Sequence, residues 1–231
     1  FRPTGHLCVR FLNKSFYKGG MKHSKDKACG EFNVNISPKL AEIIGLLCAE
    51  GCHVVSYSSY WGKDKGKNRY FVDDKSERIE FFNKDHILLK HYQDLLFRVF
   101  KYKAKITKHG KVNICKIQII RFIISKVKLG HTSWNIPKFI SLGTIKIKIS
   151  FIRGYFDGDG SASSGKIRFS SVNKNALVQV SKVLNDLDFL HTLQDASFRP
   201  GRKPIYTLQL SRKEGERFFS LSHTGSDLRK K

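Results

Sequence analysis

The 231-residue chain has no apolar run that approaches the length of a membrane span, and its opening segment FRPTGHLCVR has no hydrophobic signal region. Acidic residues are also scarce: 19 Asp and Glu stand against 43 Lys and Arg, a formal net charge of +24. Such an excess creates a positive field over the whole surface and favours polyanionic partners. Because no membrane segment is present, nucleic acid fits better than an anionic membrane. Charge alone leaves open a binding protein of the ribosomal type that has no enzymatic activity.

Cysteine is equally sparse, and the five cysteines cannot all be paired. An odd count in a chain of this size fits a reducing intracellular compartment, cytoplasm or organelle interior, better than a secreted disulfide framework. The chain also lacks the C-x2-C or H-x3-H spacing of a zinc site. Four residues near the start of the sequence could be assembled into a zinc site without the support of such spacing: His6, Cys8, His23 and Cys29.

Two short segments share one pattern, IIGLLCAEG at residues 43–51 and IRGYFDGDG at residues 152–160. Each is an apolar helical run that ends in a carboxylate and a glycine. The carboxylates are Glu50 and Asp159, and they would lie beside one another if the two helices pack together. Two carboxylates at one point repel, and a divalent cation is the usual remedy.

Small residues four apart give each segment a flat stripe, because residues at i and i+4 lie on one helix face. Such stripes allow two helix backbones to approach closely. The glycines that follow the acids, Gly51 and Gly160, suit the left-handed conformation that ends many helices. The stripe residues are Gly45 and Ala49 in the first segment and Gly154 and Gly158 in the second.

This pattern resembles the LAGLIDADG homing endonuclease family, in the single-chain form that carries two motifs. The family's metal-binding acid is the penultimate motif residue, which falls on Glu50 and Asp159 here. The resemblance implies a site-specific endonuclease that hydrolyses both strands of a long, nearly asymmetric DNA site, with one acid from each motif helix holding divalent ions. Mg²⁺ is the expected cofactor; Mn²⁺ is expected to substitute, and Ca²⁺ to bind without supporting cleavage. Cys48 replaces an acid common at the sixth motif position, which leaves the metal-binding position itself unchanged.

The segments after the two motifs follow one order, which predicts an internal repeat. In each half the pattern gives two extended runs, a helix with one apolar face, a hairpin and a closing helix. In the first half the second extended run covers residues 69–82, and the hairpin opens with a predicted strand at residues 102–108. We expect a mixed α/β protein of the α+β type: two pseudo-twofold-related αββαββα subdomains, an antiparallel β saddle, and motif helices packed at the subdomain interface. The expected parts are a basic N-terminal arm (1–36), a first subdomain (37–129), a linker (130–150) and a second subdomain (151–231).

Several predicted strands alternate between apolar residues and Lys, Arg, Ser, Thr or Gln. The polar faces carry the side chains that grip phosphates and read base edges, and a twisted β-ribbon fits the major groove. In the family the strands form a saddle over the duplex. We expect steeply salt-sensitive DNA binding. The expected contacts are Tyr57, Ser59, Arg69, Lys75, Arg78, Lys103, Lys105, Thr107, Lys108, Lys111, Asn113, Lys166, Arg168, Ser170, Arg199, Arg202, Lys203, Thr207 and Gln209.

The family also places a basic residue near each metal to assist the water network. Lys116 is the candidate in the first half, although an exposed strand lysine would have the same pattern. Two other functions are open on the same scaffold: an RNA-binding maturase that acts on intron RNA, and a DNA-binding regulator that does not cut. A monomer is expected, because one chain carries both motifs.

Overall fold

The computed structural model describes residues 34–63, 69–198 and 200–222, without the side chains of residues 62–74. Residues 1–33 of the expected N-terminal arm (1–36) lie outside the described residues. The first half begins with a motif helix and contains an antiparallel sheet in the order β1-β2-β3. Its elements are α1 (Pro38–Glu50), β1 (Gly51–Lys63), β2 (Arg69–Phe82), α2 (His86–Phe100), β3 (Lys111–Ile114) and α3 (Ile117–Lys126).

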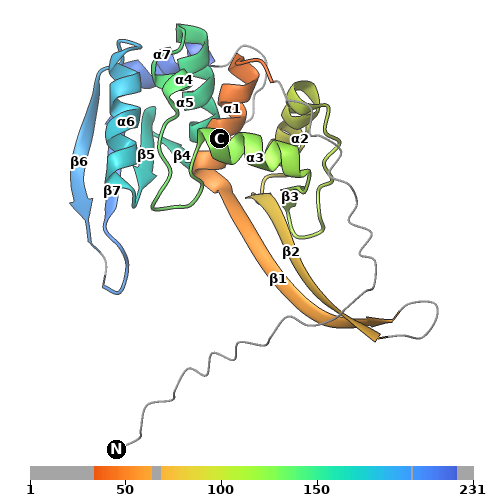
Figure 1. Ribbon diagram of the computed structural model, residues 1–231. Helices are drawn as coiled ribbons and strands as arrows, with labels where there is room; N and C mark the ends of the chain where they lie inside the picture. The colour runs from red at the N-terminus through yellow and green to blue at the C-terminus, as the bar shows by residue number, and fades with distance from the viewer. Residues whose placement is uncertain (1–33, 64–68, 199, 223–231) are drawn as a thin grey trace, which may run out of the picture. The chain divides into compact units, whose positions relative to one another are not determined.

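The second half repeats this plan with an antiparallel sheet in the order β4-β5-β7-β6 (Figure 1). The mixed fold with antiparallel sheets is therefore as predicted. Its elements are α4 (Lys138–Ser141), α5 (Ile145–Asp159), β4 (Gly160–Ser163), β5 (Lys166–Ser171), α6 (Lys174–Asn185), β6 (His191–Ser197), β7 (Ile205–Leu210) and α7 (Arg212–Ser222).

The first half departs from the predicted αββαββα order because residues 102–108 do not form a strand. They contribute only an isolated bridge between Ile106 and Val112. The carbonyl of Ala104, which a neighbouring strand would otherwise bind, accepts a hydrogen bond from Gln93 Nε2 on α2 at 2.5 Å. The segment is therefore held by α2, and the described part of this half has three strands.

The segment expected to be a linker is packed into the structure. Trp134, Ile136 and Ile140 are buried in the core, and α5 begins at Ile145. Asn173, which caps the start of α6, also donates from its side chain to the carbonyl of Trp134 at 2.8 Å. The segment that leads into the motif helix α5 is thus anchored in the core before that helix begins.

The two halves differ most in their first hairpins. Strands β1 and β2 pair without a register shift from Gly51 opposite Phe81 to Lys63 opposite Arg69, and this hairpin extends well beyond the helices (Figure 1). The corresponding β4 has only four residues and turns tightly into β5. The first hairpin of the second half is therefore much shorter than that of the first half.

Candidate active site and nucleic-acid interface

The two motif helices pack with their backbones in contact. A Cβ atom built on Gly45 would lie within 3.0 Å of the backbone oxygen of Phe151, and one on Gly154 would lie within 3.0 Å of the backbone oxygen of Glu42. Real Cβ atoms do not approach other atoms so closely. The small-residue stripes thus have the role predicted from their spacing, and no other residue type fits at these two positions without moving a helix.

The same packing brings the ends of the helices together. Glu50 is the last residue of α1 and Asp159 is the last residue of α5. A Cβ on Gly158 would lie within 3.0 Å of the Ala49 Cβ and 3.5 Å from Glu50 Cγ. Glu50 is half-buried and Asp159 is exposed. The two carboxylates therefore belong to one end of the helix pair and remain open to a ligand from solvent.

The glycines after the acids do not have the conformation predicted for them. Gly51 has φ −89° and ψ 143°, and Gly160 has φ −74° and ψ 157°, so both are extended and not left-handed. Their requirement is steric: a Cβ on Gly51 would collide with Leu47, and one on Gly160 with Phe156. Glycine allows each chain to turn directly from the helix into a strand.

Asn83 connects the end of β2 to the first acid. Its Nδ2 donates to Glu50 Oε1 at 3.5 Å, while its Oδ1 accepts from the backbone of Asp85 at 2.8 Å. Ser171 has the matching place in the second half, since its Oγ accepts from the backbone of Asn173 at 3.1 Å. Serine has no amide to extend toward Asp159, so the two acids have different neighbours.

Two of the buried residues behind the acids, Cys48 and Tyr155, stay uncharged at neutral pH. Burial raises the pKa of the Cys48 thiol strongly, which excludes a thiolate in the first motif at neutral pH. Burial also raises the pKa of Tyr155, and the charge of Asp159 adds to this effect. The Asp157 carboxyl, at the sixth motif position of the second segment, is only 2% exposed. These positions therefore form the packed wall of the site, and Glu50 and Asp159 are its accessible acids.

The donor set fits magnesium or manganese better than zinc. Among the described residues no group of three or more His, Cys, Asp and Glu side chains could hold a metal by itself. Mg²⁺ commonly binds through one or two carboxylates and completes its shell with water and substrate phosphates. Two carboxylates at a solvent-accessible junction match this mode.

The outer face of the second sheet gathers the polar residues predicted there. Opposed pairs in an antiparallel sheet lie on one face, and the pairs alternate between faces. Arg168 is opposite Gln209, with Nε donating to Oε1 at 2.9 Å. Ser170 is opposite Thr207, with hydroxyls 3.2 Å apart. Lys166 shares this face, while Ile167 and Phe169, which alternate with these residues, are buried in the core.

The first sheet brings only part of its predicted contacts together. Arg78, Lys111 and Asn113 share the outer face, since Glu80 is opposite Asn113 and Arg78 is two residues from Glu80. Glu80 accepts from Arg78 at 2.6 Å and from Lys111 at 2.8 Å, and these hydrogen bonds hold its pKa below the usual value. The register places Tyr57, Ser59 and Lys75 on the opposite face with buried Ile79, and Arg69 pairs with Lys63 at the far end of the hairpin.

The comparisons with known proteins agree with this architecture. Residues 146–221 match the family model described as a LAGLIDADG-like domain. This part of the chain, which contains the second motif, is therefore similar to a LAGLIDADG-like domain. The homing endonuclease I-DmoI from Desulfurococcus mucosus is 24% identical over 193 residues, which are 80% of this chain and 88% of that protein.

Solved structures of I-DmoI share the two-motif LAGLIDADG fold. A variant in complex with its nicked target DNA and manganese has a TM-score of 0.58 at 20% identity, covering 81% of this chain and 96% of that chain. The complex of I-DmoI with DNA and manganese has a TM-score of 0.55 at 22% identity, covering 83% and 99% of the two chains. At these identities the structural likeness establishes the fold.

The remaining predicted contacts lie outside the two sheets. Lys103, Lys105 and Lys108 are exposed and Thr107 is half-buried in the segment that does not form a strand. Arg202 and Lys203 are exposed in the loop before β7, and Arg199 is outside the described residues. Lys116 is exposed immediately before α3, and its catalytic role stays a prediction.

The sequence reasoning missed two polar residues, Asn83 beside Glu50 and Glu80 between two cations. Glu80 could have been found, because it is two residues from Arg78 and must share its strand face. The same rule separates Lys75 from Arg78, which are three residues apart. Asn83 had no comparable signal, since only the packing of β2 against α1 brings it to the acid.

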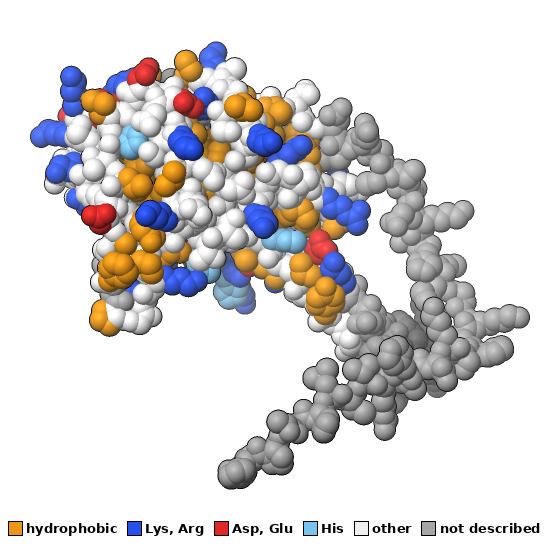
Figure 2. All heavy atoms as spheres, turned by 60° about the vertical axis from the view of Figure 1, so that its left-hand side comes forward, with side chains coloured by type: hydrophobic (Ala, Val, Ile, Leu, Met, Phe, Trp, Pro, Cys, Tyr) orange, Lys and Arg blue, Asp and Glu red, His pale blue; other side chains and the backbone are white. Residues whose placement is uncertain are grey.

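None of the helices in the described part of the chain is long and apolar enough to cross a membrane. Figure 2 shows Lys and Arg side chains scattered over the face that it presents, with Asp and Glu far fewer. The excess of positive charge seen in the composition is thus displayed on the folded surface, where it would attract a polyanion.

Proposed function

We propose that the chain is a homing endonuclease, a site-specific enzyme that hydrolyses both strands of a long, nearly asymmetric DNA duplex. One observation carries this proposal: the acids Glu50 and Asp159 end two helices whose backbones are in contact. Each acid is followed directly by a strand of an antiparallel sheet with a polar outer face. The curated relative I-DmoI is a homing endonuclease, which supports the same activity here.

Glu50 and Asp159 would hold divalent ions, with Mg²⁺ as the physiological choice and Mn²⁺ as a substitute. A bound metal would polarise the phosphoryl oxygen and lower the pKa of an attacking water. The protein's own contribution is placement. The small-residue stripes would fix the two carboxylates at one junction, Asn83 would orient Glu50, and the packed wall would leave Glu50 and Asp159 as the accessible acids. One acid from each half suits a reaction that must cut two strands.

The duplex would lie across the outer faces of both sheets, with one half of the site on residues 37–129 and the other on residues 151–231. Arg168 and Gln209 in the second sheet, and Arg78 and Lys111 in the first, have the chemistry to read bases or grip phosphates. Both acids and both sheets belong to one chain, so a monomer would be sufficient to cut both strands. The proposed enzyme would act in an intracellular compartment. The shorter β4 hairpin predicts fewer contacts on the second half-site.

A homing endonuclease is typically encoded within an intron or another mobile element, and its target is the site that this element interrupts. The test therefore uses the duplex formed by joining the two sequences that flank the element. Wild type, Glu50→Gln and Asp159→Asn are incubated with it in Mg²⁺ and then in Ca²⁺, and each strand is scored separately. The proposal expects cutting by wild type in Mg²⁺, with cutting lost or reduced to nicking in each variant while DNA binding persists. Tight binding without cutting in any divalent metal would contradict it and favour a regulator. Binding to intron RNA alone would favour a maturase.

A further inference from the structure

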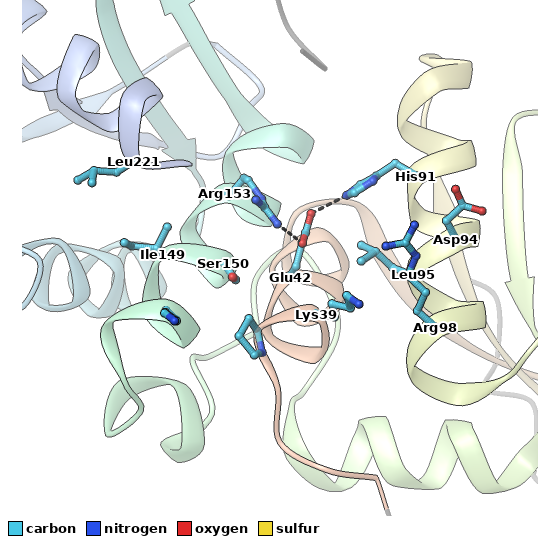
Figure 3. A pocket seen from close by; sticks show the side chains of 12 residues that line it. Lys39, Glu42, His91, Asp94, Leu95, Arg98, Ile149, Ser150, Arg153 and Leu221 are labelled. Atoms are coloured by element: carbon cyan, nitrogen blue, oxygen red, sulfur yellow. Dashed lines mark hydrogen bonds and ion pairs between the residues drawn. The ribbon is translucent and has the colours of Figure 1, made fainter. Parts of the chain in front are cut away.

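A cleft of about 580 Å³ lies at the opposite ends of the motif helices from the acids. It is lined by side chains of α1, α2 and α5 together with Leu221 at the end of α7 (Figure 3). Lys39 in the cleft precedes Glu50 by eleven residues on the same helix, which at 1.5 Å per residue separates them by about 16 Å. The cleft is therefore distinct from the junction at which the proposed nuclease site lies.

The buried acid of the cleft is already neutralised within the protein. Glu42 is 2% exposed and binds Arg153 of α5 and His91 Nε2 of α2, the latter at 2.5 Å (Figure 3). Burial alone would raise the pKa of Glu42, but the hydrogen bond from His91 and the charge of Arg153 outweigh it and hold the pKa below its ordinary value. This carboxylate is thus unavailable to compensate other cations in the cleft.

Three further cations line the cleft from three different helices: Lys39 from α1, Arg98 from α2 and Lys146 from α5. Within the described part of the chain none of the three forms an ion pair, and Asp94 is the one carboxylate of the lining besides Glu42. The first turns of α1 and α5, which both face the cleft, carry no acidic residue. The positive ends of two helix dipoles therefore add to the positive charge of the side chains.

The lining is not only basic. Leu95, Ile149 and Leu221 contribute an apolar surface beside the cations, and Leu221 is 45% exposed. Sites for small ligands combine such apolar surface with a few convergent charged groups, and occupy volumes of about 300–1,000 Å³. Lysine and arginine form strong charge-assisted hydrogen bonds with phosphate oxygens. A ligand with both an apolar ring and a phosphate matches this combination.

We propose that this cleft binds a nucleotide phosphate, with Lys39, Arg98 and Lys146 around the phosphate and the apolar side chains against the base or sugar. The nucleotide could be free or could be one unit of a single-stranded nucleic acid, because both present the same phosphate and base. This inference goes beyond the proposed nuclease activity and does not depend on it.

The experiment titrates the full chain with ATP, with tripolyphosphate and with a single-stranded RNA 12-mer, by calorimetry at moderate salt. The Lys39→Ala/Lys146→Ala variant is compared with Lys182→Ala, which removes an exposed lysine of α6 outside the cleft. Thermal unfolding verifies that both variants fold. Cleavage of the DNA target is measured in parallel and should be unchanged in both, so a failure of the nuclease proposal would be recognised separately.

The cleft variant should bind its nucleotide ligand at least about tenfold more weakly than wild type, and Lys182→Ala should bind as wild type. Binding of ATP, lost in the cleft variant and stronger than that of tripolyphosphate, would support a free nucleotide. Binding of RNA alone, lost in the cleft variant, would support a nucleic-acid chain. No binding by wild type, or an equal loss in Lys182→Ala, would overturn the proposal.

Discussion

The contact between Ala49 and Gly158 offers a sharp test of the packing that places the acids. In Gly158→Ala the new methyl group would lie within 3.0 Å of the Ala49 Cβ, whereas carbon atoms in contact lie about 3.5–4 Å apart. The two helices would have to separate by on the order of 1 Å. We expect overpacking to cost about 2–3 kcal/mol, offset by up to about 1 kcal/mol of helix propensity gained on replacing glycine.

The double variant Ala49→Gly/Gly158→Ala should reverse this loss, because it moves the methyl group from one helix to the other. Propensity terms cancel in a double-mutant cycle, so the coupling energy measured by urea unfolding should be about 2–3 kcal/mol. Because Ala49 and Gly158 immediately precede the two acids, DNA cleavage by Gly158→Ala should fall by about 10²-fold and largely recover in the double variant.

Two results would refute this reasoning. Additive effects of the two single changes would show that these residues do not meet, and full cleavage by Gly158→Ala would show that the helix junction does not position the acids. Gly154→Ala is the matched control. Its methyl group would meet the backbone oxygen of Glu42, so no side-chain replacement on α1 should rescue it.

Three further substitutions probe the surroundings. Asn83→Ser removes the amide that reaches Glu50, and a long hydrogen bond to a charged group contributes about 0.5–1 kcal/mol. Kinetics measured separately for each DNA strand should show one strand cut about two to five times more slowly. Equal slowing of both strands would contradict this prediction. Glu80→Gln frees Arg78 and Lys111 on the outer face of the first sheet from their carboxylate. DNA titrations between about 50 and 200 mM salt should then give tighter binding and a steeper dependence of affinity on salt. An unchanged salt dependence would count against that face as the DNA surface. Glu42→Gln leaves Arg153 in a largely buried site without its carboxylate and should lower the free energy of unfolding by about 2–4 kcal/mol near neutral pH. The folded-state pKa of Glu42 lies below the ordinary 4.5, so this stabilisation is complete above pH 4.5 and is lost as the pH falls through the folded-state pKa. In urea titrations at acidic pH the stabilities of wild type and variant should therefore converge. A difference in stability that does not depend on pH would contradict the ion pair.

The features that could be predicted from the sequence are those set by local geometry. Residues four apart share a helix face in any helix, so the stripe of Gly45 and Ala49 followed from spacing alone. The bounds predicted for β2, residues 69–82, also match, because a strand needs only a run of suitable residues. Local chemistry is sufficient where the neighbours along the chain are the neighbours in space.

The features that the sequence did not reveal depend on partners distant in the chain. The expected strand at residues 102–108 is absent because the Gln93 side chain takes the carbonyl of Ala104. The face of Tyr57 depends on its pairing with Lys75 across the hairpin, which is set by the turn and not by the strand itself. Neither relation is visible in a window of neighbouring residues.

The most direct test of the central claim is the position of the metal. A crystal of the protein with its DNA target, grown in Mn²⁺ and measured near the manganese absorption edge, would locate bound ions by anomalous scattering. The account predicts anomalous density at the junction of α1 and α5, within bonding distance of the Glu50 and Asp159 carboxylates. Manganese bound elsewhere, with both carboxylates directed away from the scissile phosphates, would contradict it.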